Sequence, residues 1–275
     1  RYLCDLALID GPDGTTRVEA DVVLTIEDGR FTAVESGPTP APTPANIRHL
    51  RGLTIPGLAN AHSHAFHRAL RSRTQADRGS FWTWRDLMYR AAERLDPDGY
   101  HRLARATFAE MAMAGVTSLG EFHYVHHAPD GSRYDDPNAM GSALLAAAAE
   151  AGIRITLLDT LYLHGGLTAD GHTPAEGTQR RYDDGSFEAW AQRVDALTAG
   201  DGQRIGAAIH SVRAVDPTAM AAIGRWAAER RAPLHAHVSE QRAENRQCLD
   251  HHGRTPVGLL ADAGVLGERF SAVHA

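Results

Sequence analysis

Two histidines, His62 and His64, follow a short apolar run and are separated by a single residue. Alternate residues of a β-strand point to the same side, so both imidazoles can face one space and bind one cation. The simpler explanation is a polar loop with two incidental histidines, and an H-x-H pattern alone does not exclude it. A second histidine group further along the chain favours the metal site.

That second group is the stretch HAHVSE at residues 235–240. His235 and His237 share one face of the expected strand, and His237 lies nearer its C-terminal end, which makes it the better third ligand. His235 is expected to be a hydrogen-bonded core histidine or a support for a ligand. Glu240 follows where the strand turns into a loop, and a carboxylate beside a metal can transfer protons in a hydrolysis. The alternative for Glu240 is an acid at a helix N-terminus.

Imidazole and carboxylate ligands suit one divalent ion, and zinc is the one we expect. A zinc site lowers the pKa of bound water to about 7, which provides a nucleophile near neutral pH. His274 ends the last apolar run of the chain and can orient the attacking water.

Composition excludes several other functions. The 275 residues are 43% hydrophobic and carry a net charge of −6 without a basic cluster, so neither nucleic acid nor a membrane surface is an expected partner. Cys4 and Cys248 are too few for a disulfide framework. Since no signal peptide and no apolar run of membrane-spanning length is visible, we expect a cytoplasmic protein that acts on a small molecule.

From residue 53 onward, short apolar runs alternate with helical patterns, which is typical of a parallel sheet covered by helices. We expect strands at 53–59, 116–122, 154–162, 204–212, 232–238 and 270–274. The helices between them are expected at 96–114, 139–151, 186–198, 216–230, 242–250 and 256–263. A doubly wound sheet should carry a glycine-rich turn after its first strand, and none is present. Polar residues follow nearly every strand instead, which predicts an α/β fold of the (β/α)8 TIM-barrel type.

The first 36 residues show strand-like alternation with an Asp28-Gly29 turn, and a proline-rich linker follows at 37–44. We therefore predict a small N-terminal β-sandwich module with its linker at 1–50 and a barrel domain at 51–275. Six expected strands fall short of the eight of a complete barrel. The expectation is that the barrel is truncated before its last strands and that the chain is part of a longer protein.

Five stretches resemble the amidohydrolase superfamily, in particular its deaminase branch, and they look most like the formimidoylglutamate deiminases of histidine degradation. They are HSHAFHRAL (62–70), SFWTWRDLMYR (80–90), GEFHYVHH (120–127), IHSVRAV (209–215) and HVSEQ (237–241). The resemblance implies hydrolysis of N-formimidoyl-L-glutamate to N-formyl-L-glutamate and ammonia. It also implies zinc ligands at His62, His64 and His237, with Glu240 as proton shuttle and His274 on the attacking water. The superfamily's aspartate ligand would follow the eighth strand, beyond residue 275.

By the same resemblance, the substrate-binding residues would be His67, Arg85, Tyr124, His210 and Arg213. His67 departs from the family pattern, which has glutamine there in many relatives. Guanidinium groups suit the two carboxylates of a formimino dicarboxylate, because they form bidentate hydrogen bonds with carboxylates. The glycine-rich stretch 165–186 could form a lid, and we expect a homodimer.

Two alternatives remain open. One is a deaminase of guanine-like or other heterocyclic amines on the same scaffold, which would not need two arginines for its substrate. The other is a catalytically inactive binding barrel that keeps the pocket without the metal aspartate.

Overall fold

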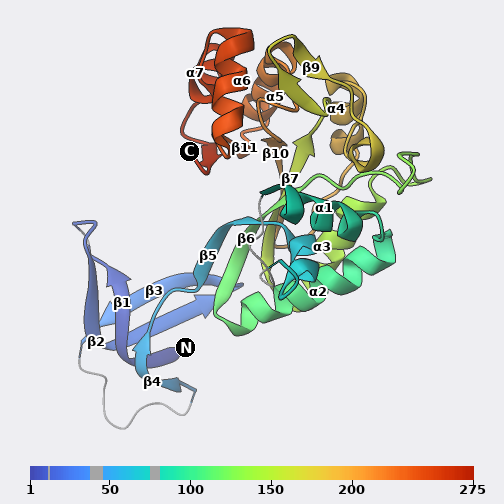
Figure 1. Ribbon diagram of the computed structural model, residues 1–275. Helices are drawn as coiled ribbons and strands as arrows, with labels where there is room; N and C mark the ends of the chain where they lie inside the picture. Colours follow the sequence, from blue (N-terminus) through green and yellow to red (C-terminus); the bar gives the residue numbers. More distant parts are fainter. Residues whose placement is uncertain (12, 38–45, 75–80) are drawn as a thin grey trace. The chain divides into compact units, whose positions relative to one another are not determined.

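The computed structural model describes residues 1–11, 13–37, 46–74 and 81–275, and it divides the chain into two compact units, 1–58 and 59–275 (Figure 1). The expected proline-rich linker lies outside the described residues apart from Gly37. No helix in the described ranges has both the length and the apolar character needed to cross a bilayer.

The small N-terminal unit is a four-stranded sheet in the order β3-β2-β1-β4, which agrees with the expected small β module, although the described residues form one sheet where a β-sandwich was expected. Its strands are β1 (Tyr2–Asp10), β2 (Thr16–Glu27), β3 (Arg30–Ser36) and β4 (Arg48–Thr54). The Asp28-Gly29 turn joins β2 to the antiparallel β3, and both turn residues have positive φ, 49° and 73°, as a tight hairpin turn requires. The described residues of this unit form one sheet layer, with Cys4, Ala7 and Val22 buried on it.

The prediction of a single strand at 53–59 is wrong. Two strands occupy this region, β4, which ends at Thr54, and β5 (Leu58–Ser63). Pro56 lies between them, and proline has no N–H with which to continue a ladder. β4 pairs in parallel with β1, so residues 48–54 belong to the small sheet and the expected domain boundary at 50/51 falls inside β4.

The second unit contains a six-stranded sheet in the order β12-β11-β10-β7-β6-β5, which confirms the α/β barrel class. Besides β5, its strands are β6 (Val116–His123), β7 (Arg154–Leu161), β10 (Gln203–Ile209), β11 (Leu234–His237) and β12 (Phe270–Val273). Consecutive strands from β6 to β12 pair in parallel, so their C-terminal ends meet at one edge. Gly120 of β6 allows a close approach to β5, since a Cβ there would lie 2.7 Å from the carbonyl oxygen of Ala61.

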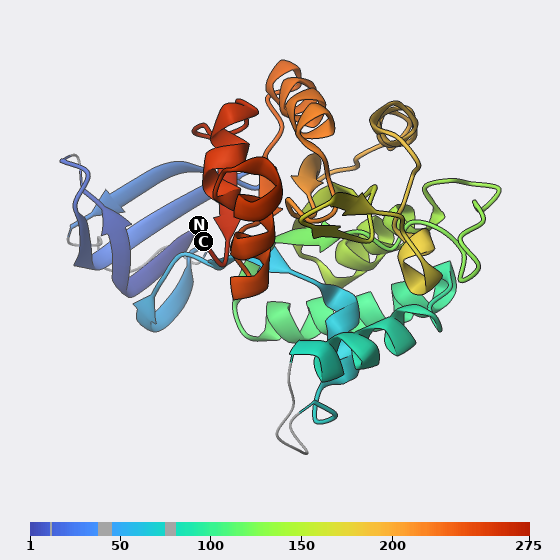
Figure 2. The same ribbon diagram turned by 45° about the horizontal axis from the view of Figure 1, so that its top comes forward.

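Helices surround these strands on the outside (Figure 2). They are η1 (Ala65–Leu70), α1 (Phe81–Ala92), α2 (Pro97–Met113), α3 (Ala139–Ala151), η2 (Gly177–Arg181), α4 (Phe187–Asp195), α5 (Pro217–Glu229), α6 (Arg242–His252) and α7 (Pro256–Asp262). Asp96 and Asp216 cap α2 and α5, because their carboxylates accept backbone N–H bonds from the first turn, and Gly152 ends α3 with a left-handed φ of 71°. A small hairpin, β8 (Gly166–Thr168) and β9 (Gly171–Thr173), follows β7.

A buried ion network fastens α4 to the sheet. The guanidinium of Arg193, 5% exposed, donates hydrogen bonds of 2.7–3.0 Å to the carboxylates of Asp159 on β7 and Asp184. His126 lies 3.8 Å from Asp159 and His127 lies 3.2 Å from Asp184. The network is fully desolvated, so each member depends on the others.

Replacement of Arg193 by methionine is therefore expected to lower the free energy of unfolding by about 3–5 kcal/mol, because two buried carboxylates lose their counter-charge. Arg254, which pairs with Asp262 on the surface, provides the matched control, and Arg254→Met should cost less than about 1 kcal/mol. Urea unfolding of both variants measures the difference. Equal losses would contradict this account of the network.

His126 should make stability depend on pH. Burial, followed by the charge of Arg193, lowers the pKa of His126 to about 4. In the unfolded chain this histidine has an ordinary pKa of about 6.5, so on acidification it takes up a proton at a higher pH than in the folded protein. The contribution of neutral His126 to the free energy of unfolding is therefore complete above pH 6.5 and is lost as the pH falls toward 4. We compare the free energy of unfolding at pH 7 and at pH 5, in excess chelator, for the wild type and for His126→Gln. The loss of stability between these two pH values should be about 2 kcal/mol smaller in His126→Gln. Identical pH profiles would argue against this role of His126.

Candidate active site

A cavity of about 460 Å³ opens among the C-terminal ends of the barrel strands. All ten residues singled out by the sequence line it: His62, His64, His67, Arg85, Tyr124, His210, Arg213, His237, Glu240 and His274. The parallel strands explain this convergence, because each of these residues lies at or beyond the C-terminal end of a strand or on η1 or α1.

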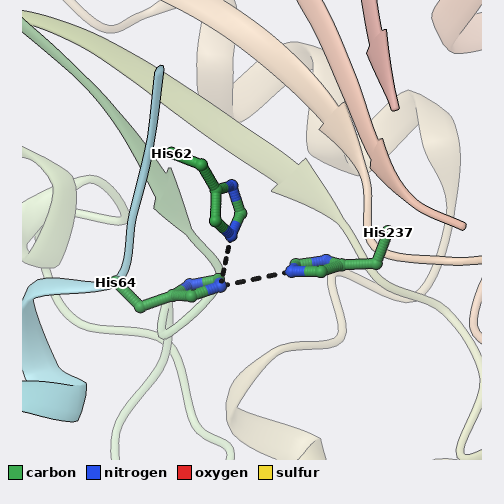
Figure 3. Close-up of side chains that lie close together, drawn as sticks. All are labelled: His62, His64 and His237. Atoms are coloured by element: carbon green, nitrogen blue, oxygen red, sulfur yellow. Dashed lines mark hydrogen bonds between the residues drawn. The ribbon is translucent and has the colours of Figure 1, made fainter. Parts of the chain in front are cut away.

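Three imidazoles meet at the floor of this cavity. The Nε2 atom of His64 lies 3.1 Å from Nε2 of His62 and 3.2 Å from Nε2 of His237 (Figure 3). His62 lies in β5, His64 directly follows it, and His237 ends β11. The fold thus brings His64 and His237, which are 173 positions apart in the sequence, into contact.

Backbone carbonyls fix the tautomers of two of these rings. Nδ1 of His64 is 3.0 Å from the carbonyl oxygen of Phe122, and Nδ1 of His237 is 3.2 Å from that of His210. A carbonyl oxygen can only accept, so both Nδ1 atoms carry the proton and both Nε2 atoms present lone pairs. Two facing lone pairs at 3.2 Å repel each other unless a positive charge lies between them.

The nitrogen spacing fits a metal ion. Ligands about 2.0–2.1 Å from one zinc ion, at tetrahedral to octahedral angles, lie about 2.9–3.4 Å apart. Burial lowers the pKa of His62 to about 4 and that of His64 and His237 well below the usual 6.5. All three rings are therefore neutral at physiological pH, which is the form that coordinates metals.

A second cluster, His123, His126 and Asp159, also has the residue types of a metal site. Arg193 already donates hydrogen bonds to both carboxylate oxygens of Asp159. A divalent cation there would face the fixed guanidinium charge, so this cluster is explained by the ion network of α4.

Glu240, Arg213 and His274 form the polar side of the cavity. A guanidinium nitrogen of Arg213 donates a 2.6 Å hydrogen bond to Glu240, and Nε2 of His274 is 4.0 Å from the other oxygen of that carboxylate. The ring of His274 stacks on His237 with centroids 5.3 Å apart. Glu240 thus lines the same cavity as the three convergent nitrogens and is not one of the converging groups.

His67 and Tyr124 contact each other deep in the cavity. Nε2 of His67 is 3.1 Å from the Tyr124 hydroxyl, and its ring lies 4.5 Å from that of His64. Burial lowers the pKa of His67 to about 3 and raises that of Tyr124 well above 10, so both are neutral hydrogen-bonding groups. His210 is likewise neutral, because burial and then the charge of Arg213 lower its pKa.

Several cavity residues were missed by the sequence analysis. They are Trp84, Met88, Tyr89, Tyr162, Gln179, Tyr182, Ser211 and Gln247. Tyr162 directly follows β7 and could have been found by its strand-end position. Gln179 lies within the stretch expected to form a lid, where its amide donates to the Tyr162 hydroxyl and to the Gly165 carbonyl. That stretch supplies one wall of the cavity, and whether it moves remains a prediction.

The cavity-bearing part of the chain matches a known family. Residues 53–275 match the amidohydrolase family. The formimidoylglutamate deiminase of Pseudomonas aeruginosa is 40% identical over 82% of this chain and 50% of its own length. The 8-oxoguanine deaminase of the same species is 27% identical over 91% of this chain and 55% of its own length. The chain thus spans about half the length of these curated relatives.

Two solved structures show the same fold. An amidohydrolase from Brucella melitensis superposes with a TM-score of 0.84 and 31% identity over 100% of this chain and 59% of its own. An atrazine chlorohydrolase from Arthrobacter aurescens, solved with zinc, gives a TM-score of 0.79 and 20% identity over 100% of this chain and 61% of its own. The second similarity is evidence for the fold alone.

Metal binding should depend on His237 and tolerate loss of a histidine outside the cavity. We expect His237→Ala to weaken zinc binding by at least about 100-fold, because one of the three proposed nitrogen ligands is removed. His101 is the matched control, since it pairs with Glu150 and does not line the cavity. Calorimetric zinc titration of the metal-stripped full natural chain measures both variants. Wild-type affinity in His237→Ala would contradict the site.

Proposed function

Since this chain belongs to the amidohydrolase family, we propose that it is the catalytic part of a metal-dependent deiminase that converts N-formimidoyl-L-glutamate and water into N-formyl-L-glutamate and ammonia. The observation that carries the proposal is one cavity that combines three convergent imidazole nitrogens, the Glu240 carboxylate and two arginine side chains. The 40% identity to a formimidoylglutamate deiminase supports the choice of substrate.

We propose His62, His64 and His237 as the ligands of one divalent ion, with zinc as our choice. The chemistry that such a bound ion supplies is Lewis-acid activation of water near neutral pH. The tautomers set by the Phe122 and His210 carbonyls support this assignment, because they direct two lone pairs at the same point.

Glu240 is the proposed proton carrier. It accepts the proton of the attacking water at a carboxylate oxygen and delivers a proton to the nitrogen that leaves as ammonia. His274, 4.0 Å from Glu240, would hold the attacking water in line. Both side chains line the cavity beside the nitrogen cluster, which supports these roles.

Arg85 and Arg213 are the proposed partners of the two substrate carboxylates, and a guanidinium can bind a carboxylate through two hydrogen bonds. Tyr124 and His210 supply neutral donors, and His67, through its contact with Tyr124, completes this group. We further propose that the reaction belongs to histidine degradation in the cytoplasm. The homodimer stays a prediction.

A heterocyclic amine is the competing substrate class. Four aromatic side chains of the cavity, Trp84, Tyr89, Tyr162 and Tyr182, could stack on a planar ring, and one relative is an 8-oxoguanine deaminase. Such a ring carries no carboxylate pair, so the two arginines distinguish the two functions.

Ammonia release by the full natural chain tests the proposal. We expect release from N-formimidoyl-L-glutamate that stops in excess chelator, and a fall in kcat/KM of about 100-fold in Arg213→Ala and in Arg85→Ala. Arg254→Ala removes an exposed arginine of the same charge and should leave kcat/KM unchanged.

Two results would overturn parts of the proposal. Release that chelator does not affect would refute the metal mechanism. Turnover of 8-oxoguanine in place of formimidoylglutamate, with little effect of either arginine variant, would favour the competing function.

A further inference from the structure

The side chain of Glu244 is fully buried in the first turn of α6, although neither the sequence motifs nor the cavity lining includes it. One of its carboxylate oxygens accepts the N–H of Ser239 at 3.1 Å, and the other accepts the N–H of Glu240 at 3.2 Å. A buried carboxylate with two backbone donors holds its surroundings in one conformation.

These hydrogen bonds do more than cap the helix. The N-cap of α6 is Gln241, and a glutamate three residues after the N-cap normally bonds the N-cap backbone N–H. Glu244 instead reaches the two residues before Gln241, in the loop that carries Glu240. Its hydrogen bonds thus act on the loop beside the cavity.

The loop needs such support because its backbone is strained. Ser239 has a φ of 56°, in the left-handed region that costs a non-glycine residue about 1 kcal/mol or more. This conformation places Glu240 in the cavity. Release of the Ser239 and Glu240 N–H groups would allow the loop to relax.

Glu244 also contacts the guanidinium of Arg213. The Nε atom of Arg213 lies 3.5 Å from a carboxylate oxygen of Glu244, while its terminal nitrogen donates to Glu240. Arg213 therefore lies between two carboxylates, one buried and one in the cavity. Without Glu244, the guanidinium charge would be balanced by Glu240 alone.

We propose that Glu244 is a positioning residue that acts on the cavity through two groups at once, the Glu240 loop and the Arg213 guanidinium. It holds the loop that carries Glu240, and its contact with Nε holds the Arg213 guanidinium in one orientation in the cavity. Arg213 is thereby oriented for an incoming substrate carboxylate. The inference rests on the proposed function for the role of Arg213, but the loop geometry stands by itself.

The test compares Glu244→Gln with Asn245→Ala in the full natural chain. Asn245 is a matched control, because its side-chain oxygen accepts the Ser239 hydroxyl at 2.8 Å and so supports the same loop through a side chain, not through a backbone N–H. Amide hydrogen exchange at Ser239 and Glu240 should become at least about tenfold faster in Glu244→Gln and change less than about threefold in Asn245→Ala.

Steady-state kinetics separate positioning from folding. Glu244→Gln should lower kcat through Glu240 and raise KM through Arg213, each by about tenfold, whereas a loss of folded enzyme lowers kcat alone. On the Arg213→Ala background the same substitution should cost at least about threefold less in kcat/KM, because the two residues act together. If Glu244→Gln does not fold, Glu244→Asp, which keeps the charge but shortens the side chain, takes its place in each measurement.

Each outcome decides one question. Unchanged exchange with unchanged KM in the Glu244 variant would overturn the inference and leave the proposed function intact. Absence of ammonia release in the wild type, with the expected exchange pattern, would refute the proposed function and leave the positioning of the loop intact. A fall in kcat alone, with additive effects of the Glu244 and Arg213 variants, would assign Glu244 a purely structural role.

Discussion

The site depends on one electrostatic constraint, which is that lone pairs directed at the same point require a positive charge among them. The carbonyl oxygens of Phe122, in β6, and of His210, directly after β10, each fix the proton of one imidazole on Nδ1, so that Nε2 is left without it. The backbone, and hence the parallel pairing of the strands, thus determines which nitrogen of each of these two imidazoles carries the proton. In the metal-free protein this arrangement is unfavourable, and the surrounding fold must hold it in place.

Charge in the rest of the cavity is arranged in layers. The neutral imidazoles and Glu240 line the same cavity, and Arg213 lies between Glu240 and the buried Glu244. Neutral rings and hydroxyls at His67, Tyr124 and His210 separate this polar side from the aromatic wall. A ligand with a compact polar head and an anionic tail matches such a gradient, because each of its ends meets a group of suitable polarity.

Much of this site could be predicted from the sequence, because strand-end positions and residue spacing are local properties. The H-x-H pair and the HAHVSE stretch each lie where a short apolar run ends. The parallel strands of the barrel then place these two histidine groups in the same cavity. The strand expected at 53–59 failed because the apolar run crosses Pro56, which divides it between two sheets. Glu244 looked like an ordinary acid of a helical first turn, since its partners are backbone N–H groups that no side-chain pattern reveals. The tautomers of His64 and His237 were unpredictable for the same reason.

Gly120 shows how far such backbone control extends. It supplies no donor atom, yet a methyl group at this position would meet the Ala61 carbonyl of β5 and push β5 away from β6. His64 follows β5, and the carbonyl that accepts its Nδ1–H, that of Phe122, belongs to β6. A wider gap between β5 and β6 would therefore turn the His64 imidazole away from His62 and His237. Residue 120 should therefore tolerate substitution as poorly as the proposed ligands themselves, because the width of one inter-strand gap decides where the His64 imidazole points.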